Sequence, residues 1–167
     1  NALMGAVESA CPDPVVSVEV VKGADAVEKE VGDCLSFGIL PVVGFSFCTP
    51  QYARVAGEIS ALRRRHGRSI VCIAGGPHAS ADPKGTLAMG LEAAFVGEAE
   101  TSLPAYLNSL VERGNPEDIP GIAYRDGSGK MVYNESAVPV DLDDFPPFPK
   151  SGWLYGAIEV TRGCPYG

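Results

Sequence analysis

The apolar positions of this chain follow two periods that alternate along its first 114 residues. Four short apolar runs, most of them dense in β-branched residues, predict strands of a buried parallel sheet. They cover residues 15–21, 41–47, 70–74 and 91–96. Three longer segments repeat their apolar residues at helical spacing and predict amphipathic helices. They cover residues 24–37, 50–62 and 103–111. This alternation predicts an α/β fold with a doubly wound, mainly parallel sheet.

Turn residues mark where several of these segments begin and end. Thr49 is placed to cap a helix that starts at Pro50, because a proline in the first helical turn loses no hydrogen bond. Asp82-Pro83 predicts the start of a second, short helix, and Gly90 predicts its end.

The chain opens with Leu3, Met4 and Val7 at helical spacing, whereas a doubly wound domain normally opens with a strand. Two explanations stay open: an upstream strand belongs to the natural protein, or Asn1-Ala2 is a cloning remnant. In the first case the sheet has an unpaired edge, and we expect the chain to dimerise through it.

The composition changes after residue 114. A glycine-rich turn separates two short apolar runs and predicts a β-hairpin at 122–133. Residues 138–149 are proline-rich and acidic, which is typical of a stiff, extended linker. We therefore expect an α/β domain at 1–114, a hairpin and linker at 115–150, and the incomplete start of a further domain at 151–167.

Composition excludes several classes of partner. The net charge is −8, from 13 basic and 21 acidic residues, which argues against nucleic acid or an anionic membrane as the main partner. No apolar run reaches the roughly 18 residues of a membrane span, and no secretory leader opens the chain, so we expect a cytoplasmic protein. The five scattered cysteines are Cys11, Cys34, Cys48, Cys72 and Cys164. We expect them to be reduced thiols.

Three turns follow three of the predicted strands. Parallel strands bring their carboxyl ends to one edge of the sheet, where open α/β sheets bind ligands. The candidate cofactor-binding residues are Ser46, Phe47 and Thr49 in the first turn, Gly75, Gly76, Pro77 and His78 in the second, and Gly97, Glu98 and Glu100 in the third. Each turn alone is ordinary turn chemistry, but the paired glycines would let a bulky ligand lie against the main chain.

The motifs of these turns resemble, in the same order, those of cobalamin-binding radical SAM enzymes. They are Gly-Phe-Ser-Phe at 44–47, Gly-Gly-Pro-His-Ala-Ser at 75–80, Val-Gly-Glu-Ala-Glu at 96–100, the proline-rich stretch 142–149 and Val-Thr-Arg-Gly-Cys-Pro-Tyr-Gly at 160–167. The resemblance implies a flavodoxin-like, Rossmann-type domain that binds cobalamin. It also implies that a [4Fe–4S] cluster in the following domain of the intact protein cleaves S-adenosylmethionine.

The Arg-Gly-Cys-Pro end resembles the start of that family's C-x-x-x-C-x-x-C motif, so Cys164 is expected to be the first cysteine of an incomplete [4Fe–4S] site. Such a cluster, with one iron open, needs three thiolates in register, and the motif here supplies one. The resemblance therefore implies an accessory domain without catalytic residues of its own. We expect the chain alone to be inactive, with the missing radical SAM domain as its main partner.

Two other assignments at this edge are weaker. His78 could be an axial ligand of cobalt, but the Asp-x-His-x-x-Gly pattern of such ligands does not surround it. We therefore favour cobalamin bound without histidine ligation, with His78 as a hydrogen-bonding group. Glu98 and Glu100 could form a hydrolytic carboxylate pair, but no nucleophile stands beside a base, and acidic residues before a helix stabilise its dipole. No Gly-x-Gly-x-x-Gly or P-loop motif supports a nucleotide site.

The main hypothesis is thus a cobalamin-binding accessory domain of a radical SAM enzyme that performs methyl transfer or another radical modification. The alternative is a degenerate flavodoxin-like interaction module that binds no cofactor. If ligand lies against Gly76, we expect Gly76→Val to abolish cobalamin retention and leave the fold intact. If Gly76 is needed for a positive φ, the same change destabilises the domain with or without ligand.

Overall fold

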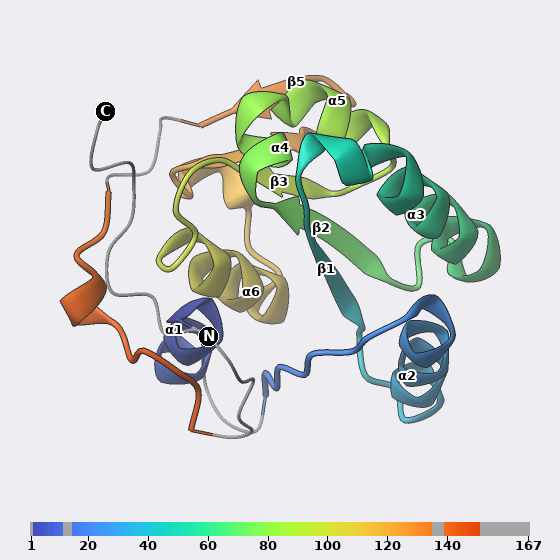
Figure 1. The fold of residues 1–167 in the computed structure, drawn as a ribbon, viewed down its shortest axis with the longest axis horizontal. Coiled ribbons are helices and arrows are strands. Elements are labelled where there is room, and N and C mark those ends of the chain that lie inside the picture. The colour runs from blue at the N-terminus through green and yellow to red at the C-terminus, as the bar shows by residue number, and fades with distance from the viewer. Residues whose placement is uncertain (1, 12–14, 135–138, 151–167) are drawn as a thin grey trace.

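The computed structural model of the chain describes residues 2–11, 15–134 and 139–150. One sheet with the strand order β1-β2-β3-β4-β5 lies between helices (Figure 1). The strands are β1 (Val42–Ser46), β2 (Val71–Gly75), β3 (Ala93–Phe95), β4 (Ile122–Arg125) and β5 (Met131–Tyr133). The first three are parallel, and the β4–β5 hairpin continues the sheet with antiparallel strands. The predicted α/β class with a flavodoxin-like, Rossmann-type sheet is confirmed.

Successive side chains of β2 enter two different cores. Cys72 and Ala74 belong to the core under α3 (Tyr52–His66) and α5 (Pro83–Ala88). Ile73 belongs to the core under α6 (Ser102–Glu112). Because β2 is buried on both faces, its sequence is apolar throughout instead of alternating with polar residues.

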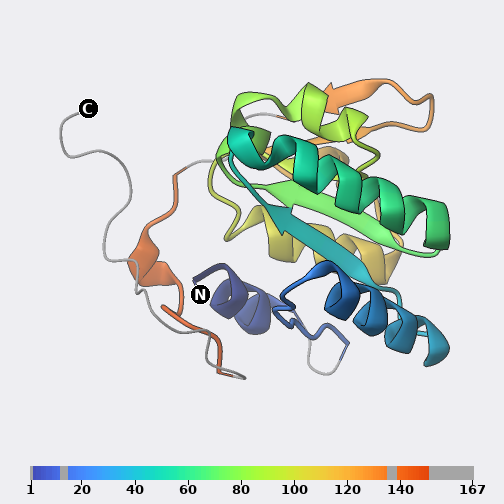
Figure 2. The ribbon, with the colours of Figure 1, turned by 45° about the vertical axis from the view of Figure 1, so that its right-hand side comes forward.

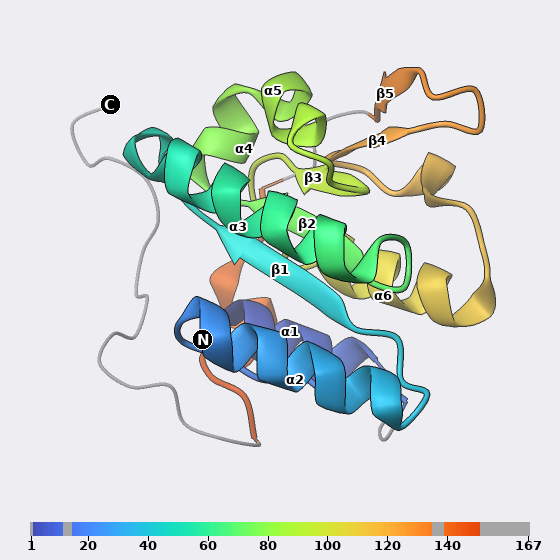
Figure 3. The ribbon, with the colours of Figure 1, turned by 90° about the vertical axis from the view of Figure 1, so that its right-hand side faces the viewer.

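The two N-terminal helices pack toward helices on opposite faces of the sheet: α2 toward α3 and α1 toward α6. In α2 (Ala24–Ser36), Val31 joins the core under α3, and Glu28 Oε1 lies 2.7 Å from His66 Nε2. α1 (Ala2–Ala10) lies beside α6, where Asn108 Nδ2 donates to the carbonyl of Ala10 at 3.2 Å. Figures 2 and 3 show both helices next to the outer strand β1, with the hairpin at the far side of the sheet.

The strand prediction for residues 15–21 is wrong. Residues 16–22 carry no regular structure, and within the described part of the chain β1 pairs on one side only, with β2. β-branched residues favour an extended backbone, but a strand exists only where a neighbour accepts its hydrogen bonds. The local pattern of these residues therefore could not decide the outcome.

The helix starts were predicted with mixed success. Asp82 caps α5 by accepting the N–H of Gly85 at 2.8 Å, as expected. Thr49 is not an N-cap: it is the first residue of the short 3₁₀ helix η1 (Thr49–Gln51), which Cys48 caps before α3 begins. The short helix α4 (Pro77–Ala81), directly after the paired glycines, was not anticipated.

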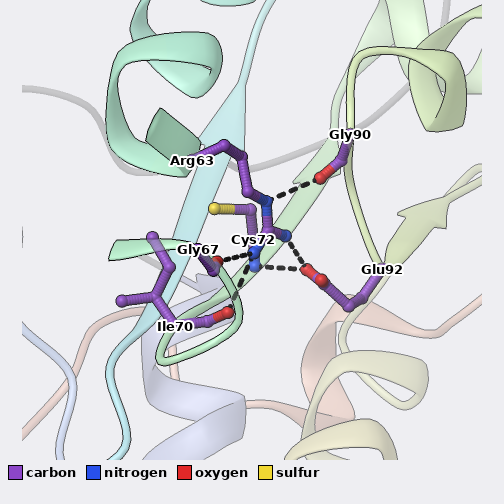
Figure 4. A network of polar contacts seen from close by, with 6 residues as sticks. All are labelled: Arg63, Gly67, Ile70, Cys72, Gly90 and Glu92. Carbon is purple, nitrogen blue, oxygen red and sulfur yellow. Dashed lines mark hydrogen bonds and ion pairs between the residues drawn. The ribbon is translucent and has the colours of Figure 1, made fainter. Parts of the chain in front are cut away.

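Arg63, at the end of α3, ties together the amino ends of β2 and β3 (Figure 4). Its guanidinium donates to the carbonyls of Gly90, Gly67 and Ile70 at 2.9–3.0 Å, and it pairs with Glu92. Glu92 also accepts the N–H of Cys72 at 2.7 Å. Arg63 thus fixes the edge of the sheet opposite the three predicted turns.

Four of the five cysteines lie in the described part of the chain, and all four are free thiols there. Cys72 is fully buried, and burial raises the pKa of its thiol to about 11. Among the helices of the described residues, none combines the length and apolar character that crossing a bilayer requires.

Candidate functional site at the carboxyl edge

The first two predicted turns meet at the carboxyl ends of β1 and β2. Phe47 donates its N–H to the carbonyl of Gly75 at 3.4 Å, and His78 donates its N–H to the carbonyl of Phe47 at 3.2 Å. These main-chain bonds lock the turns to each other, as their position after adjacent parallel strands predicted.

Gly76 occupies a backbone conformation and a space that only glycine fits. Its φ is +90° and its ψ is −176°, a region that is essentially restricted to glycine. A Cβ there would lie 2.9 Å from Ser46 Oγ and 3.1 Å from the nitrogen of Phe47. The expectation that Gly76→Val leaves the fold intact is therefore wrong, and the positive-φ explanation holds. At Gly75 a Cβ would meet only Phe95 Cβ within 4 Å, at an ordinary 3.7 Å.

The third turn joins the same edge through one side chain. Gly97 donates its N–H to Ser80 Oγ at 2.9 Å. Glu98 Oε2 accepts the N–H of Val140 at 2.7 Å, which anchors the proline-rich segment to this turn. Glu100 is buried just before α6, 3% exposed, and so does not lie on an open surface.

His78 is buried where the first two turns meet. Its ring lies 5.1 Å, centroid to centroid, from both Phe47 and Tyr52. Nδ1 lies 3.0 Å from Thr49 Oγ1, so the hydroxyl that was expected to cap a helix orients this imidazole instead. Nε2 is buried and has no hydrogen-bond partner among the described residues.

A floor of small residues, which the sequence reasoning missed, lies on the α6 side of the sheet near this edge. Gly44 and Ser46 are exposed and alternate with Val43 and Phe45, which pack into the core under α3. Gly75, half-buried, lies beside Ser46 in the register of β1 with β2. We call Gly44, Ser46 and Gly75 the small-residue floor. Small residues at every second position of Gly-Phe-Ser were the sequence feature that could have revealed it.

Ser102 is a second residue that the sequence did not single out. It is 1% exposed at the start of α6, and its Oγ has no partner within the described residues. Burying a hydroxyl without a hydrogen bond costs about 1–3 kcal/mol. No spacing or motif marks this serine, because its burial depends on how α6 packs.

The proline-rich segment is docked, not merely extended. A Cβ on Gly5 of α1 would lie 2.7 Å from the carbonyl oxygen of Pro146, and Pro149 is buried. Lys150 donates its N–H to the Glu8 carboxylate. Residues 139–150 therefore connect the third turn, at Glu98, to α1. We call them the strap.

The charged side chains of the three turns are all acidic. Residues 46–52, 75–80 and 96–102 include Glu98 and Glu100 but no lysine or arginine. No group of three or more metal-ligating side chains occurs in the part of the chain that the structure describes. Cys164, the predicted cluster ligand, lies outside the described residues.

An open depression of about 480 Å³ lies beyond β3, at the hairpin. Its lining consists of Glu117, Asp118, Pro120, Tyr133 and Asn134. The pairing of Phe95 with Ile122 and of Ala123 with Tyr133 puts it near the carboxyl end of β3. Its two carboxylates make it a poor place for an anionic ligand.

The comparisons with known proteins agree with this arrangement. The profile of the B12 binding domain matches residues 36–107, which include all three turns. The N-terminal domain of a hypothetical protein from Thermotoga maritima is 30% identical, with a TM-score of 0.51 over 64% of this chain and 79% of that domain. No curated protein matches the chain.

Two solved enzymes share the fold at lower identity. The cobalamin-dependent S-adenosylmethionine radical enzyme OxsB, solved with aqua-cobalamin and S-adenosylmethionine, is 17% identical with a TM-score of 0.66. The radical S-adenosylmethionine methyltransferase TsrM from Kitasatospora setae is 19% identical with a TM-score of 0.61. Each alignment covers 83% of this chain but only 20% of OxsB and 28% of TsrM. The profile match and the Thermotoga domain together identify this chain as a member of the B12-binding domain family.

Proposed function

We propose that this chain binds cobalamin at the carboxyl edge of β1, β2 and β3, as the accessory domain of a larger radical SAM protein. The observation that carries the proposal is that the three turns inside the matched region form one connected edge. Phe47, Gly75 and His78 link the first two turns through the main chain, and Ser80 links the third.

The residues of this edge fit a corrinoid. Cobalamin needs space for a wide ring and a nucleotide tail, together with hydrogen-bond partners for its amides, hydroxyls and phosphodiester. The small-residue floor offers space beside the main chain, and buried atoms of His78 and Ser102 lack partners among the described residues. When bound, cobalamin supplies a cobalt centre that can carry a methyl group.

The residues that we propose to form the cobalamin site are those of the three turns. They are Ser46, Phe47, Thr49, Gly75, Gly76, Pro77, His78, Gly97, Glu98 and Glu100, with Gly44 and Ser102 added by the structure. Gly76 and Glu98 act indirectly, because Gly76 shapes the second turn and Glu98 holds the strap.

His78 is not expected to ligate cobalt. Its Nδ1 is occupied by Thr49, and the ring is held against Phe47 and Tyr52. Turning Nε2 toward a metal above the edge would break these contacts. We therefore propose that cobalamin is bound without a histidine ligand from this chain.

The wider chemistry belongs to the intact protein. We propose that its radical SAM domain holds the [4Fe–4S] cluster, with Cys164 as the first ligand, and uses S-adenosylmethionine in methyl transfer or another radical modification. The chain described here would be inactive without that domain. A cytoplasmic location and reduced thiols are consistent with such a cluster, which oxygen and oxidants degrade.

The outer edge of β1 is the proposed contact between copies of the isolated chain. Within the described residues β1 pairs only with β2, so its other edge has no strand partner, and α1 and α2, which lie next to β1, would have to leave room for a second copy. Unpaired edges associate readily. Light scattering should then show a dimer, and a monomer at high concentration would contradict this contact.

Reconstitution tests the main proposal directly. The purified chain is mixed with hydroxocobalamin, desalted, and its visible spectrum recorded, with chemically unfolded chain as the control. We expect close to one corrinoid per folded chain and none on the unfolded control. A colourless folded chain would favour the alternative, a flavodoxin-like interaction module without a cofactor.

A further inference from the structure

His78 differs from every other residue of the three turns in what it can offer a ligand. It is the only one with a ring N–H donor and the only one that can carry a positive charge, because these turns contain no lysine or arginine. The charged residues of these turns are the carboxylates of Glu98 and Glu100. An anionic ligand group at this edge would therefore find its best partner in His78.

The hydrogen bonding of the ring leaves one nitrogen for such a partner. The 3.0 Å contact between Thr49 Oγ1 and Nδ1 is compatible with either tautomer of the ring. In the tautomer used for this inference the hydroxyl donates to Nδ1 and the ring proton is on Nε2, since a neutral imidazole carries one N–H. That N–H is buried without an acceptor among the described residues, and the residue is 7% exposed.

The other histidine shows that an unpartnered ring is not the rule in this protein. His66 Nε2 lies 2.7 Å from Glu28 Oε1 and is satisfied within the chain. A buried donor without an acceptor is unfavourable, so a ligand acceptor that bonded His78 Nε2 would be stabilising.

The ring lies within one side-chain layer of solvent. Thr49 and Tyr52, which contact it, are both exposed, and Tyr52 is 38% exposed. A ligand on this edge would have to displace side chains of this layer to reach Nε2.

Resting on the cobalamin binding proposed above, we propose that His78 donates its Nε2 proton to the phosphodiester of the nucleotide tail and so selects complete corrinoids over tail-less ones. Cobalamin carries its single phosphodiester in that tail. Cobinamide keeps the corrin ring and its amide side chains but lacks the nucleotide and the phosphodiester. The pair of ligands therefore distinguishes a contact with the nucleotide tail, which carries the phosphodiester, from a contact with the corrin ring.

The test compares the binding of hydroxocobalamin and diaquocobinamide by equilibrium dialysis. The two variants are His78→Gln, whose amide nitrogen can reach the place of Nε2, and His78→Asn, whose shorter side chain reaches only the place of Nδ1. Because a hydrogen bond to a charged group is strong, we expect His78→Asn to weaken cobalamin binding about 10- to 100-fold. We expect its cobinamide binding to stay unchanged, and His78→Gln to keep most of the preference for cobalamin. Thermal unfolding of both variants checks that they fold.

Three outcomes would overturn this role. Equal weakening of both ligands by His78→Asn would mean that His78 holds the loop or touches the ring. An unchanged cobalamin affinity in a folded His78→Asn protein would mean that it makes no ligand contact. Failure of the wild-type chain to bind either corrinoid would instead overturn the proposed function itself, together with this role.

Discussion

Gly76 approaches Ser46 so closely that a Cβ on the glycine would lie 2.9 Å from the serine Oγ. This close approach joins the second turn to the end of β1. Gly76 also has a φ of +90°, so the two paired glycines differ in how well they tolerate a side chain. Gly76 is required by the fold, whereas Gly75 has room for a methyl group. Gly76 is therefore a structural glycine, whereas a substitution at Gly75 can test whether a ligand occupies the space beside it.

Replacing Gly76 should therefore destabilise the domain whether or not ligand is present. We expect Gly76→Ala to lower the free energy of unfolding by about 1–3 kcal/mol, measured with urea, because alanine is strained in this conformation. Gly75→Ala is the matched control and should change it by less than about 1 kcal/mol. Equal stability of the two variants would contradict this account of the turn.

Filling the small-residue floor should affect ligand binding and spare the fold. A Cβ on Gly44 has only Ile73 Cγ1 within 4 Å, at 3.8 Å, and valine favours strands. We expect Gly44→Val to fold and to lose retained hydroxocobalamin after desalting. Gly57→Ala, on α3 with nothing within 4 Å of its Cβ, should bind as the wild type does. If a folded Gly44→Val protein retained hydroxocobalamin normally, the small-residue floor would not be part of the binding site.

The strap should detach when Gly5 gains a side chain. A Cβ there would lie 2.7 Å from the Pro146 carbonyl oxygen and 3.1 Å from that of Phe148. We expect Gly5→Ala to make residues 139–150 at least several-fold more sensitive to limited proteolysis. Gly32→Ala in α2, where the Cβ meets nothing within 4 Å, should leave the cleavage rate unchanged. Equal cleavage of the two variants would show that the strap does not depend on this contact.

Arg63 should be important for stability and irrelevant to the ligand. Its guanidinium bonds three carbonyls and Glu92 at the amino edge of the sheet, away from the three turns. We expect Arg63→Ala to cost about 1–2 kcal/mol, since it removes the donor of the part-buried Ile70 carbonyl together with the bonds to two exposed carbonyls. Arg64→Ala is the control, because Arg64 lies on the exposed helix face and bonds Ser60, one turn earlier in the same helix. If Arg63→Ala weakened cobalamin binding while the protein stayed fully folded, the two edges would be coupled.

Local pattern determined much of the fold from the sequence alone. The apolar runs at 41–47, 70–74 and 91–96 became β1, β2 and β3, and the clearest helical periods became α2, α3 and α6. Asp82 capped α5 as expected. These features depend on neighbours within a few residues, so the sequence contains what decides them. The order of strand and turn also sufficed to bring three turns to one edge.

Tertiary structure decided what depends on distant partners. Residues 16–22 have the composition of a strand but no regular structure, because strand pairing needs a neighbour that local sequence does not specify. Thr49 binds His78, 29 residues away, instead of capping its own helix. The proline-rich strap docks on α1 because Gly5, far away in the sequence, leaves room for it. His78 Nε2 and Ser102 Oγ become buried and unpartnered among the described residues only through packing. The sequence therefore located the edge, and long-range contacts decided which of its atoms are left for a ligand.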